Sequence, residues 1–366
     1  RQGGSAAPTP RAADNPVPAG CVVIGAGPTG LSAAYHLDAG TLLLERQASV
    51  GGGCRSMHDQ GFIFDRPERI ACSDDAYVLH MYERLLGDNQ HWQTPRIGTC
   101  GQHAYTPNQP PHADSGSRFG YPLRGGLQAL MAGFLPHIRG KVELRAEVAV
   151  VLPAEHALLL TNGRRQQYDQ LISTVPLPEL VRLTGGAAPA GVKRAAGALR
   201  HVSLRCVNLG IDRPGLTDKH WIDYPEDTIF QRIFVQGNAS NACNAPGGFG
   251  FTCEIAYSPA RPLPLDGDGL IARCLEDCVR TGFLRADDRV LAASQLDLPY
   301  ARAVYDDTYD ANVTTIRDWM AHHDILLAGR HGAAAADAPE HAFLAGRRIA
   351  ETVLARRTGT RRAAAT

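Results

Sequence analysis

The sequence has few lysines and no excess of charge of either sign. Only three of its 37 basic residues are lysines, Lys141, Lys193 and Lys219, so the other 34 (37 − 3) are arginines. The acidic residues also number 37, and the formal net charge is therefore +0. A balanced chain lacks the basic surface of a nucleic-acid binder, and three lysines offer few candidates for covalent catalysis through an amine. We therefore expect no nucleic-acid partner.

Metal-type cysteine spacing and long apolar runs are absent as well. The nine cysteines are an odd number and contain no C-x-x-C pair, which favours reduced thiols in a cytoplasmic protein and predicts no metal site. No apolar run is long enough to cross a bilayer. Residues 1–20 are rich in Ala, Pro and Gly without the apolar segment of a signal peptide, so they predict a disordered leader. Residues 356–366 are basic and rich in small residues, which predicts a flexible tail. The sequence indicates no oligomeric state.

A glycine-rich motif near the amino end predicts a dinucleotide site. The apolar run CVVI predicts a buried parallel strand, GAGPTGLSAAYHL a turn and a helix, and TLLLER a second strand. Gly25 permits the tight turn, Gly27 lets backbone N–H groups approach a pyrophosphate, and Gly30 allows close helix–strand packing. Glu45 ends the second strand, where a carboxylate can accept hydrogen bonds from ribose hydroxyls. This order of elements predicts an α/β fold with a Rossmann-like, doubly wound sheet.

The rest of the chain predicts a second, mainly antiparallel layer. Residues 201–257 are strand-rich, and Asn162-Gly163 marks a hairpin between two earlier strands. The nucleotide-binding domain is predicted to be discontinuous, at 21–183 plus 291–355, around a substrate-binding sheet domain at 184–290. Further expectations are helices at 76–86 and 271–280, a loop at 96–118, and a last strand and helix within 324–355.

A second glycine-rich loop identifies the dinucleotide by resemblance. GGGCRS at 51–56 would bring more backbone and an arginine to the diphosphate, and Rossmann domains that bind only NAD lack such a loop here. The stretches VVIGAGPTGLSAAYHL and LLLERQASVGGGCRS resemble the FAD-binding fingerprint of the amine oxidase and protoporphyrinogen oxidase superfamily. Gly329-Arg330 and the helix near 341–343 resemble the segment that faces the flavin in that superfamily. The resemblance implies FAD as the cofactor.

The FAD-binding residues that the resemblance implies come from the two glycine loops, the end of the second strand, one later strand and the carboxyl-terminal helix. They are Gly25, Gly27, Pro28, Thr29, Gly30, Glu45, Arg46, Gly52, Gly53, Cys54, Arg55, Val148, Gly329, Arg330, Ala342 and Phe343.

The middle of the chain resembles UDP-galactopyranose mutase and its relatives. The stretches concerned are HWIDYPEDTIFQRIFVQGNAS and GGFGFTCEIAYSP. By position, the resemblance implies that Arg232 and Tyr305 contact a substrate diphosphate as the catalytic pair, and a planar fork of donors suits Arg232 to that task. Trp221, Asn238 and Arg69 would line the substrate cleft. The expected substrate is a small molecule, with a UDP-sugar as the candidate.

Several positions depart from this resemblance. Glu68-Arg69 stand where relatives carry Gly-His, Asp223 stands where a substrate-contacting Tyr is usual, and 331–337 lack the usual Trp and Tyr. Residues 105–119 form a short segment where relatives insert a helical lid. Two alternatives to an enzyme acting on a nucleotide-linked or modified sugar therefore stay open. One is amine-oxidase-like oxidation of a small molecule by the flavin, and the other is a catalytically degenerate scaffold that binds flavin.

Overall fold

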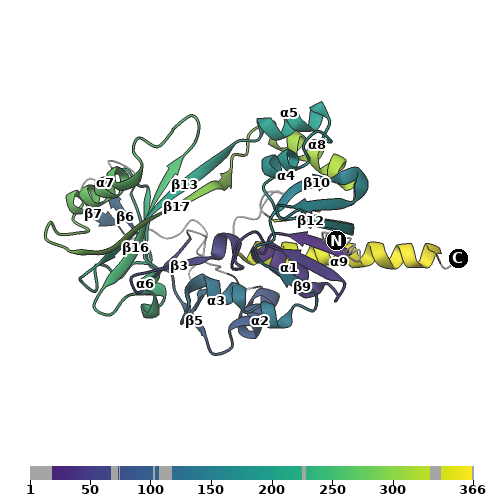
Figure 1. Cartoon of the computed structure of the whole chain (residues 1–366). Helices are drawn as coiled ribbons and strands as arrows, with labels where there is room; N and C mark the ends of the chain where they lie inside the picture. Colours follow the sequence, from purple (N-terminus) through teal and green to yellow (C-terminus); the bar gives the residue numbers. More distant parts are fainter. Residues whose placement is uncertain are drawn as a thin grey trace, which may run out of the picture.

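The protein has two lobes, one built on each of two large sheets (Figure 1). The structure is a computed structural model, which describes residues 19–66, 73, 75–101, 104–106, 118–224, 228–329 and 339–364. For residues 101, 104–106, 339–340 and 358–364 it describes the backbone alone. The predicted site residues Arg69 and Arg330, and nearly all of the predicted leader, lie outside the described residues.

The first lobe is a Rossmann-like sheet, as the opening motif predicts. Its seven strands follow the order β10-β11-β12-β1-β2-β9, with β18 paired to β12. The pairs of β1 with β2 and β12, of β2 with β9 and of β12 with β18 are parallel, and the Asn162-Gly163 turn joins β11 to β12 antiparallel. The strands are β1 (Ala19–Ile24), β2 (Thr41–Leu44), β9 (Lys141–Glu143), β10 (Val148–Leu152), β11 (Ala157–Leu160), β12 (Arg165–Ser173) and β18 (Ile325–Leu327).

Helices cover both faces of this sheet, which is why β1 is apolar without interruption. Val23 belongs to the core beneath α1 (Pro28–His36) and α9 (Pro339–Ala364), and its neighbour Val22 to the core on the other face. The former core also takes α2 (Ala76–Leu86) and α3 (Gly126–Ala132), and the latter takes α4 (Leu177–Leu183), α5 (Ala190–Ala198) and α8 (Tyr309–Ala321). Both faces are thereby closed, and the carboxyl ends of the strands stay available to a ligand.

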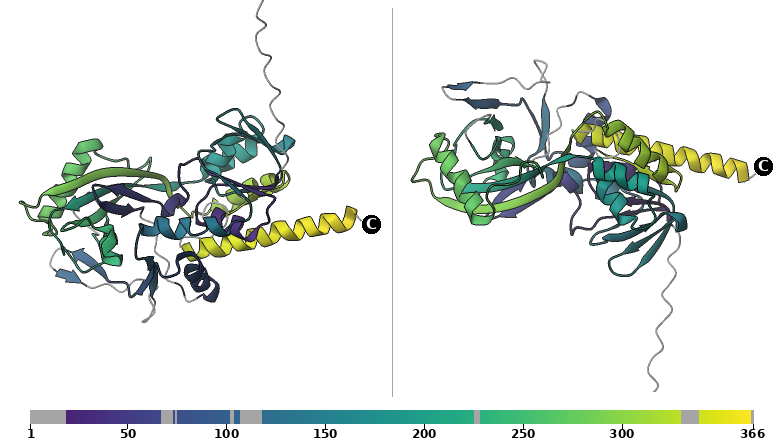
Figure 2. Two further views of the ribbon diagram at one scale, coloured as in Figure 1. Left: turned by 60° about the horizontal axis from the view of Figure 1, so that its bottom comes forward. Right: turned by 90° about the horizontal axis from the view of Figure 1, so that it is seen from above.

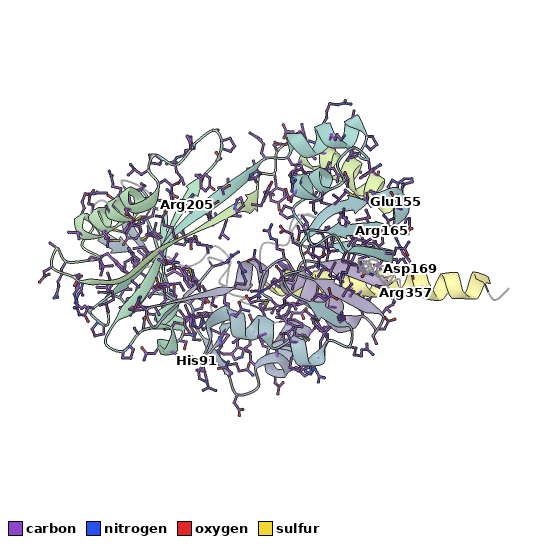
Figure 3. The ribbon with its side chains drawn as sticks, in the orientation of Figure 1. His91, Glu155, Arg165, Asp169, Arg205 and Arg357 are labelled. Atoms are coloured by element: carbon purple, nitrogen blue, oxygen red, sulfur yellow. The ribbon has the colours of Figure 1, made fainter. Side chains whose placement is uncertain are left out.

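The helix α9 runs along the first lobe and projects past it (Figures 1 and 2). An ion pair of 2.9 Å between Arg357 and Asp38 attaches it to the body, and Figure 3 labels Arg357 on this helix. Because α9 continues to Ala364, residues 356–364 are helical, where the sequence predicted a flexible tail. No described helix combines the length and the apolar character that a membrane crossing would need.

The second lobe is a mainly antiparallel sheet in the order β17-β13-β16-β15-β14-β6-β7, as expected; of its pairs only β14–β6 is parallel. Two of its strands, β6 and β7, lie in the segment 96–118 that the sequence predicted to be a loop, and that prediction was wrong. The sheet also extends past position 291, since β17 continues to Ala303. Its strands are β6 (Ile97–Gly101), β7 (Ala104–Thr106), β13 (His201–Ile211), β14 (Trp221–Asp223), β15 (Arg232–Phe234), β16 (Phe249–Tyr257) and β17 (Val290–Ala303).

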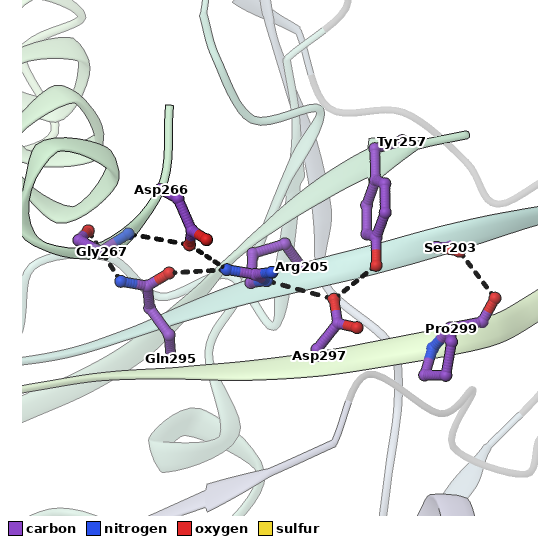
Figure 4. Close-up of polar contacts among 8 residues, drawn as sticks. All are labelled: Ser203, Arg205, Tyr257, Asp266, Gly267, Gln295, Asp297 and Pro299. Carbon is purple, nitrogen blue, oxygen red and sulfur yellow. Dashed lines mark hydrogen bonds and ion pairs between the residues drawn. The ribbon is translucent and has the colours of Figure 1, made fainter. Parts of the chain in front are cut away.

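One face of the second sheet packs on α7 (Gly267–Arg280), through core residues such as Phe251 and Leu270. Figure 4 shows how this face is fastened: Arg205 on β13 donates to Asp297 of β17 at 3.1 Å and to Asp266, the residue that caps α7, at 2.5 Å. We interpret this network as a clamp that holds α7 in place.

The opposite face of the second sheet meets the first lobe. Phe62 of β4 (Phe62–Asp65) presses against three glycines, and a Cβ atom at Gly210 would lie 2.5 Å from its ring. Residues two and four positions after Gly250 on β16, Thr252 and Glu254, point to this same face because side chains alternate along a strand. Smaller elements complete the junction: β3 (Ser56–Asp59), β5 (Gln90–Gln93), β8 (Phe119–Pro122) and α6 (Gln236–Ala239).

Candidate functional site

The first glycine turn presents backbone donors at the start of α1. Gly25 adopts a φ of 98°, and a Cβ atom at Gly30 would lie 1.8 Å from the Gly25 oxygen, so both positions need glycine. Gly27 precedes α1 and no side chain caps the helix, while Pro28 occupies its first turn. The N–H groups at the start of the helix are thus left for an anion, as in other phosphate-binding turns.

The second glycine loop touches the first one backbone to backbone. The Gly51 N–H donates to the Ala26 oxygen at 2.7 Å, and a Cβ atom at Gly52 would lie 2.8 Å from the Gly27 Cα. Gly52 also has a φ of 53°, which disfavours any side chain there. Gly53 and the buried Cys54 complete the same short turn. The two loops form a cradle of backbone that is open only because these positions have no side chains. A diphosphate needs such a cradle in order to approach the backbone N–H groups closely.

Glu45 is held over the first glycine turn. It is buried (7% exposed), and its two carboxylate oxygens accept from the Ala26 N–H at 2.8 Å and the Gln47 N–H at 2.9 Å. Arg55 donates to the Gln47 side chain at 2.9 Å; burial lowers the pKa of Arg55, and the nearby Glu45 opposes that effect. Arg46 is exposed. A carboxylate keeps acceptor capacity beyond two bonds, so Glu45 can also bind ribose hydroxyls.

The start of α9 lies against the same turn. A Cβ atom at Gly329 (φ 82°) would lie 3.4 Å from the Thr29 hydroxyl, and the Ser32 hydroxyl donates to the Phe343 oxygen at 2.7 Å. The Phe343 ring is itself in the core, 5.2 Å from the ring of Phe134. Ala342 beside it is half-buried. The structure therefore brings the segment around Gly329 and Phe343 against the glycine turn near the amino end of the described chain.

Val148, predicted to contact the cofactor, comes two residues after Ala146, whose N–H donates to the Glu45 backbone oxygen at 2.9 Å. It begins β10 in register with Leu160 and is buried, at 8% exposed. Its predicted role stays a prediction.

Arg232 and Trp221 lie on the sheet face that meets the first lobe. The Arg232 Nε donates to the Asp223 carboxylate at 2.7 Å, and Arg232 is in register with Glu254 on β16. The Trp221 ring stacks on Phe234 at a centroid distance of 5.4 Å. Two of the predicted substrate residues therefore share one surface, the face of the second sheet that packs toward the first lobe.

Asn238 and Tyr305 come from other places. The Asn238 amide nitrogen donates to the backbone oxygens of Thr217 and Lys219, at 2.9 and 2.6 Å. Tyr305 follows β17, is 51% exposed, and packs its ring 4.7 Å from that of Tyr309 on α8. Asn238 thus holds a loop of the sheet lobe, and Tyr305 lies at the junction of β17 and α8.

Sequence reasoning did not single out three buried carboxyls, those of Glu254, Asp65 and Asp277. Glu254 is 5% exposed, and burial raises its pKa to about 7 against the opposing effect of Arg232 and Arg302. The signal for it lies in FGFTCEIAY, where Thr252 and Glu254 interrupt an apolar strand at alternate positions.

Another of these carboxyls, Asp65, links three elements that lie behind the second glycine loop. It accepts from the Ser56 hydroxyl, the Tyr121 hydroxyl and the Leu127 N–H, which belong to β3, β8 and α3. Complete burial raises its pKa, which these hydrogen bonds oppose. Gln128 of α3 also donates to the Val50 oxygen, next to the loop, at 2.6 Å. Among the described residues, no group of His, Cys, Asp and Glu is arranged to hold a metal ion.

A buried histidine beside Trp221 should make the fold sensitive to acid. His220 is completely buried; its Nδ1 accepts from the Arg96 N–H at 2.9 Å, and its Nε2 lies 3.1 Å from the Gln93 side-chain oxygen. Burial, aided by Arg96, lowers the pKa of His220 to about 4. The neutral ring is therefore the stable form in the fold, and its stabilisation is complete above about pH 6.5 and is lost as the pH falls toward 4.

We expect the free energy of unfolding to drop by about 2 kcal/mol between pH 7 and pH 5 through His220 alone. Urea unfolding at both pH values measures this drop. His220→Gln keeps a donor and an acceptor but does not titrate, so the same pH change should cost it correspondingly less. An equal drop in both proteins would assign the acid sensitivity to other groups.

Comparisons with known proteins agree with the site. Residues 23–85 match the NAD(P)-binding Rossmann-like domain family, and residues 76–354 match the family described as flavin containing amine oxidoreductase. The chain belongs to the flavin-containing amine oxidoreductase family. Its cofactor is FAD, and the touching glycine loops and the buried Glu45 fit the diphosphate and ribose of that group.

Three solved structures of other proteins share the fold. A reduced UDP-galactopyranose mutase is 18% identical with a TM-score of 0.83, over 93% of this chain and 94% of that one. A putative protoporphyrinogen oxidase from Exiguobacterium sp. 255-15 is 13% identical with a TM-score of 0.71, over 91% and 98%. A redesigned putrescine oxidase is 12% identical with a TM-score of 0.71, over 92% and 98%. Because the sequence identities are only 12–18%, the likeness to these structures shows the fold alone.

Proposed function

We propose that this flavoprotein is an enzyme that acts on a nucleotide-linked sugar, as its likeness to UDP-galactopyranose mutase suggests. The observation that carries the proposal is Arg232. This half-buried arginine is held by Asp223 on the sheet face that meets the FAD lobe. Asp223 engages Nε and so orients the guanidinium, whose Nη groups suit the oxygens of a diphosphate.

Each lobe has its own task in this proposal. The residues of the two glycine loops, with Glu45 and Arg55, bind the FAD, which supplies a ring that donates or accepts electrons. Arg232 binds and orients the substrate diphosphate, and the Trp221 ring beside it flanks the ligand. Tyr305, Asn238 and Arg69 remain proposed substrate contacts. None of the described cysteines forms a disulfide, which supports a reducing, cytoplasmic setting for the enzyme.

Oxidation of an amine by the flavin is the second candidate. Membership of the amine oxidoreductase family favours it, as does the putrescine oxidase fold. The two candidates differ in what must happen first, because a mutase requires flavin that is already reduced, whereas an amine oxidase is reduced by its own substrate.

The test uses the FAD-loaded protein under anaerobic conditions. We expect turnover of UDP-galactose after reduction by dithionite, and no bleaching of the oxidised flavin by putrescine or related amines. Arg232→Ala should abolish the turnover, while Arg205→Ala, on the opposite face of the same sheet, should keep it. Bleaching by an amine without dithionite would establish the second candidate. Neither turnover nor bleaching would leave a flavin-binding scaffold.

A further inference from the structure

The buried carboxyl of Glu254 has no partner in the part of the chain that the structure describes. It forms no hydrogen bond and no ion pair there, although the side chain is only 5% exposed. In register it lies between Arg232 on β15 and Cys206 on β13. A buried carboxylate without donors is costly unless its protonation changes or a ligand completes its surroundings.

The charged and titratable groups around Glu254 come from four strands of the sheet and from the residue that follows β4. Arg232, already engaged by Asp223 of β14, and Arg302 of β17 stabilise its ionised form without touching it. Cys206 of β13 is a neutral thiol, since burial raises its pKa well above the ordinary value. Arg66 follows β4 and acts on Cys206 from the FAD lobe, and its N–H donates to the Arg55 oxygen of the second glycine loop at 3.2 Å. The cluster therefore adjoins the cofactor cradle.

We propose that Arg232, Arg302 and Glu254 form an oxyanion site that takes up one proton, on Glu254, when the anion binds. The proposal rests on the proposed function, in which Arg232 binds a diphosphate. An anion that reaches Arg232 is repelled by an ionised carboxylate at the neighbouring register position, and burial strengthens that repulsion. Protonation of Glu254 by a proton from solvent removes this repulsion, so that Arg232 and Arg302 can both attract the anion. No other bond is made or broken.

The anions chosen for the test do not titrate near neutral pH. Sulfate and UDP-glucose keep constant charge between pH 6 and 8, so any pH dependence belongs to the protein. Because burial places the pKa of Glu254 at about 7, we expect the affinity of the FAD-loaded protein for either anion to fall about tenfold from pH 6 to pH 8. Titration calorimetry in buffers of different ionisation enthalpy should show uptake of about half a proton per anion at pH 7.

Glu254→Gln separates this site from other titrating groups. The variant should bind both anions with an affinity that is flat across this pH range and close to that of the unmodified protein at pH 6. Asp297→Asn, on the opposite face of the same sheet, is the matched control and should keep the tenfold dependence. If Glu254→Gln does not fold, Glu254→Met takes its place, because it also removes the titrating carboxyl, and it should likewise lose the pH dependence and the proton uptake.

The outcomes distinguish this inference from the proposed function. UDP-glucose binding that is flat with pH in the unmodified protein, without proton uptake, overturns the proton-coupled site and leaves the sugar-nucleotide function standing. Proton-coupled binding of sulfate without any binding of UDP-glucose supports the site and contradicts that function. Absence of binding by both anions overturns both.

Discussion

Gly30→Ala should destabilise the FAD lobe severely, whereas Gly27→Ala should keep the fold and weaken FAD binding. The Cβ atom of an alanine at position 30 would lie 1.8 Å from the Gly25 oxygen, which is backbone and cannot rotate away. The cost of such overpacking is about 3 kcal/mol or more, a large part of a typical domain's stability. At position 27 the nearest atom to the new methyl group is the Gly52 Cα, at the ordinary contact distance of 3.7 Å.

The methyl group at position 27 would instead occupy the space between the two glycine loops. If the FAD diphosphate lies there, the clash should weaken FAD binding by about 10- to 100-fold, equivalent to 1–3 kcal/mol of overpacking. Thermal melting of the apoproteins measures the fold, and fluorescence titration with FAD measures the affinity. A Gly27→Ala protein that binds FAD as tightly as the unmodified protein would place the diphosphate elsewhere.

Local signals in the sequence were sufficient for the opening elements of the FAD lobe. The strand, turn and helix around Gly25 and the helix at 76–86 are specified by neighbouring residues, and the structure has them where the sequence predicts them. The strands β6 and β7 were missed because residues 96–118 are rich in Gly, Pro, Asn and His. They are strands because they pair with β14 and with each other, and β14 is far along the chain.

The substrate face was only partly predictable for the same reason. Arg232 was identified because the surrounding sequence resembles a known family. That Asp223 and Glu254 lie beside Arg232 follows only from the register of β14, β15 and β16. The importance of Gly210 and Gly250 likewise appears only when Phe62 packs against them. The register of a strand is set by its pairing with segments that are distant in the sequence, so it cannot be predicted from neighbouring residues alone.

Asp65→Ala should be the most damaging substitution of a single side chain behind the glycine loops. It removes the acceptor for three donors from three different elements, the Ser56 and Tyr121 hydroxyls and the Leu127 N–H. Each buried donor left without a partner costs about 1–3 kcal/mol, so we expect a loss of about 3–5 kcal/mol in the free energy of unfolding. Chemical denaturation of the FAD-free protein measures that loss without any contribution from the cofactor.

Graded variants show whether the hydrogen bonds of Asp65 cause the loss. Asp65→Asn keeps an acceptor for Ser56 and Leu127, and its amide can donate to the Tyr121 oxygen, so it should cost only about 1 kcal/mol. Tyr121→Phe should cost about the same, because it removes the hydroxyl's hydrogen bond to Asp65 and its weak 3.5 Å contact with the Cys243 Sγ, while the Ser56 and Leu127 bonds to Asp65 remain. Asp59→Ala, at the end of the same β3–β4 hairpin, is the matched control and should change stability by less than about 1 kcal/mol. If Asp65→Asn were as damaging as Asp65→Ala, the negative charge of Asp65, and not its hydrogen bonds, would be what the fold requires.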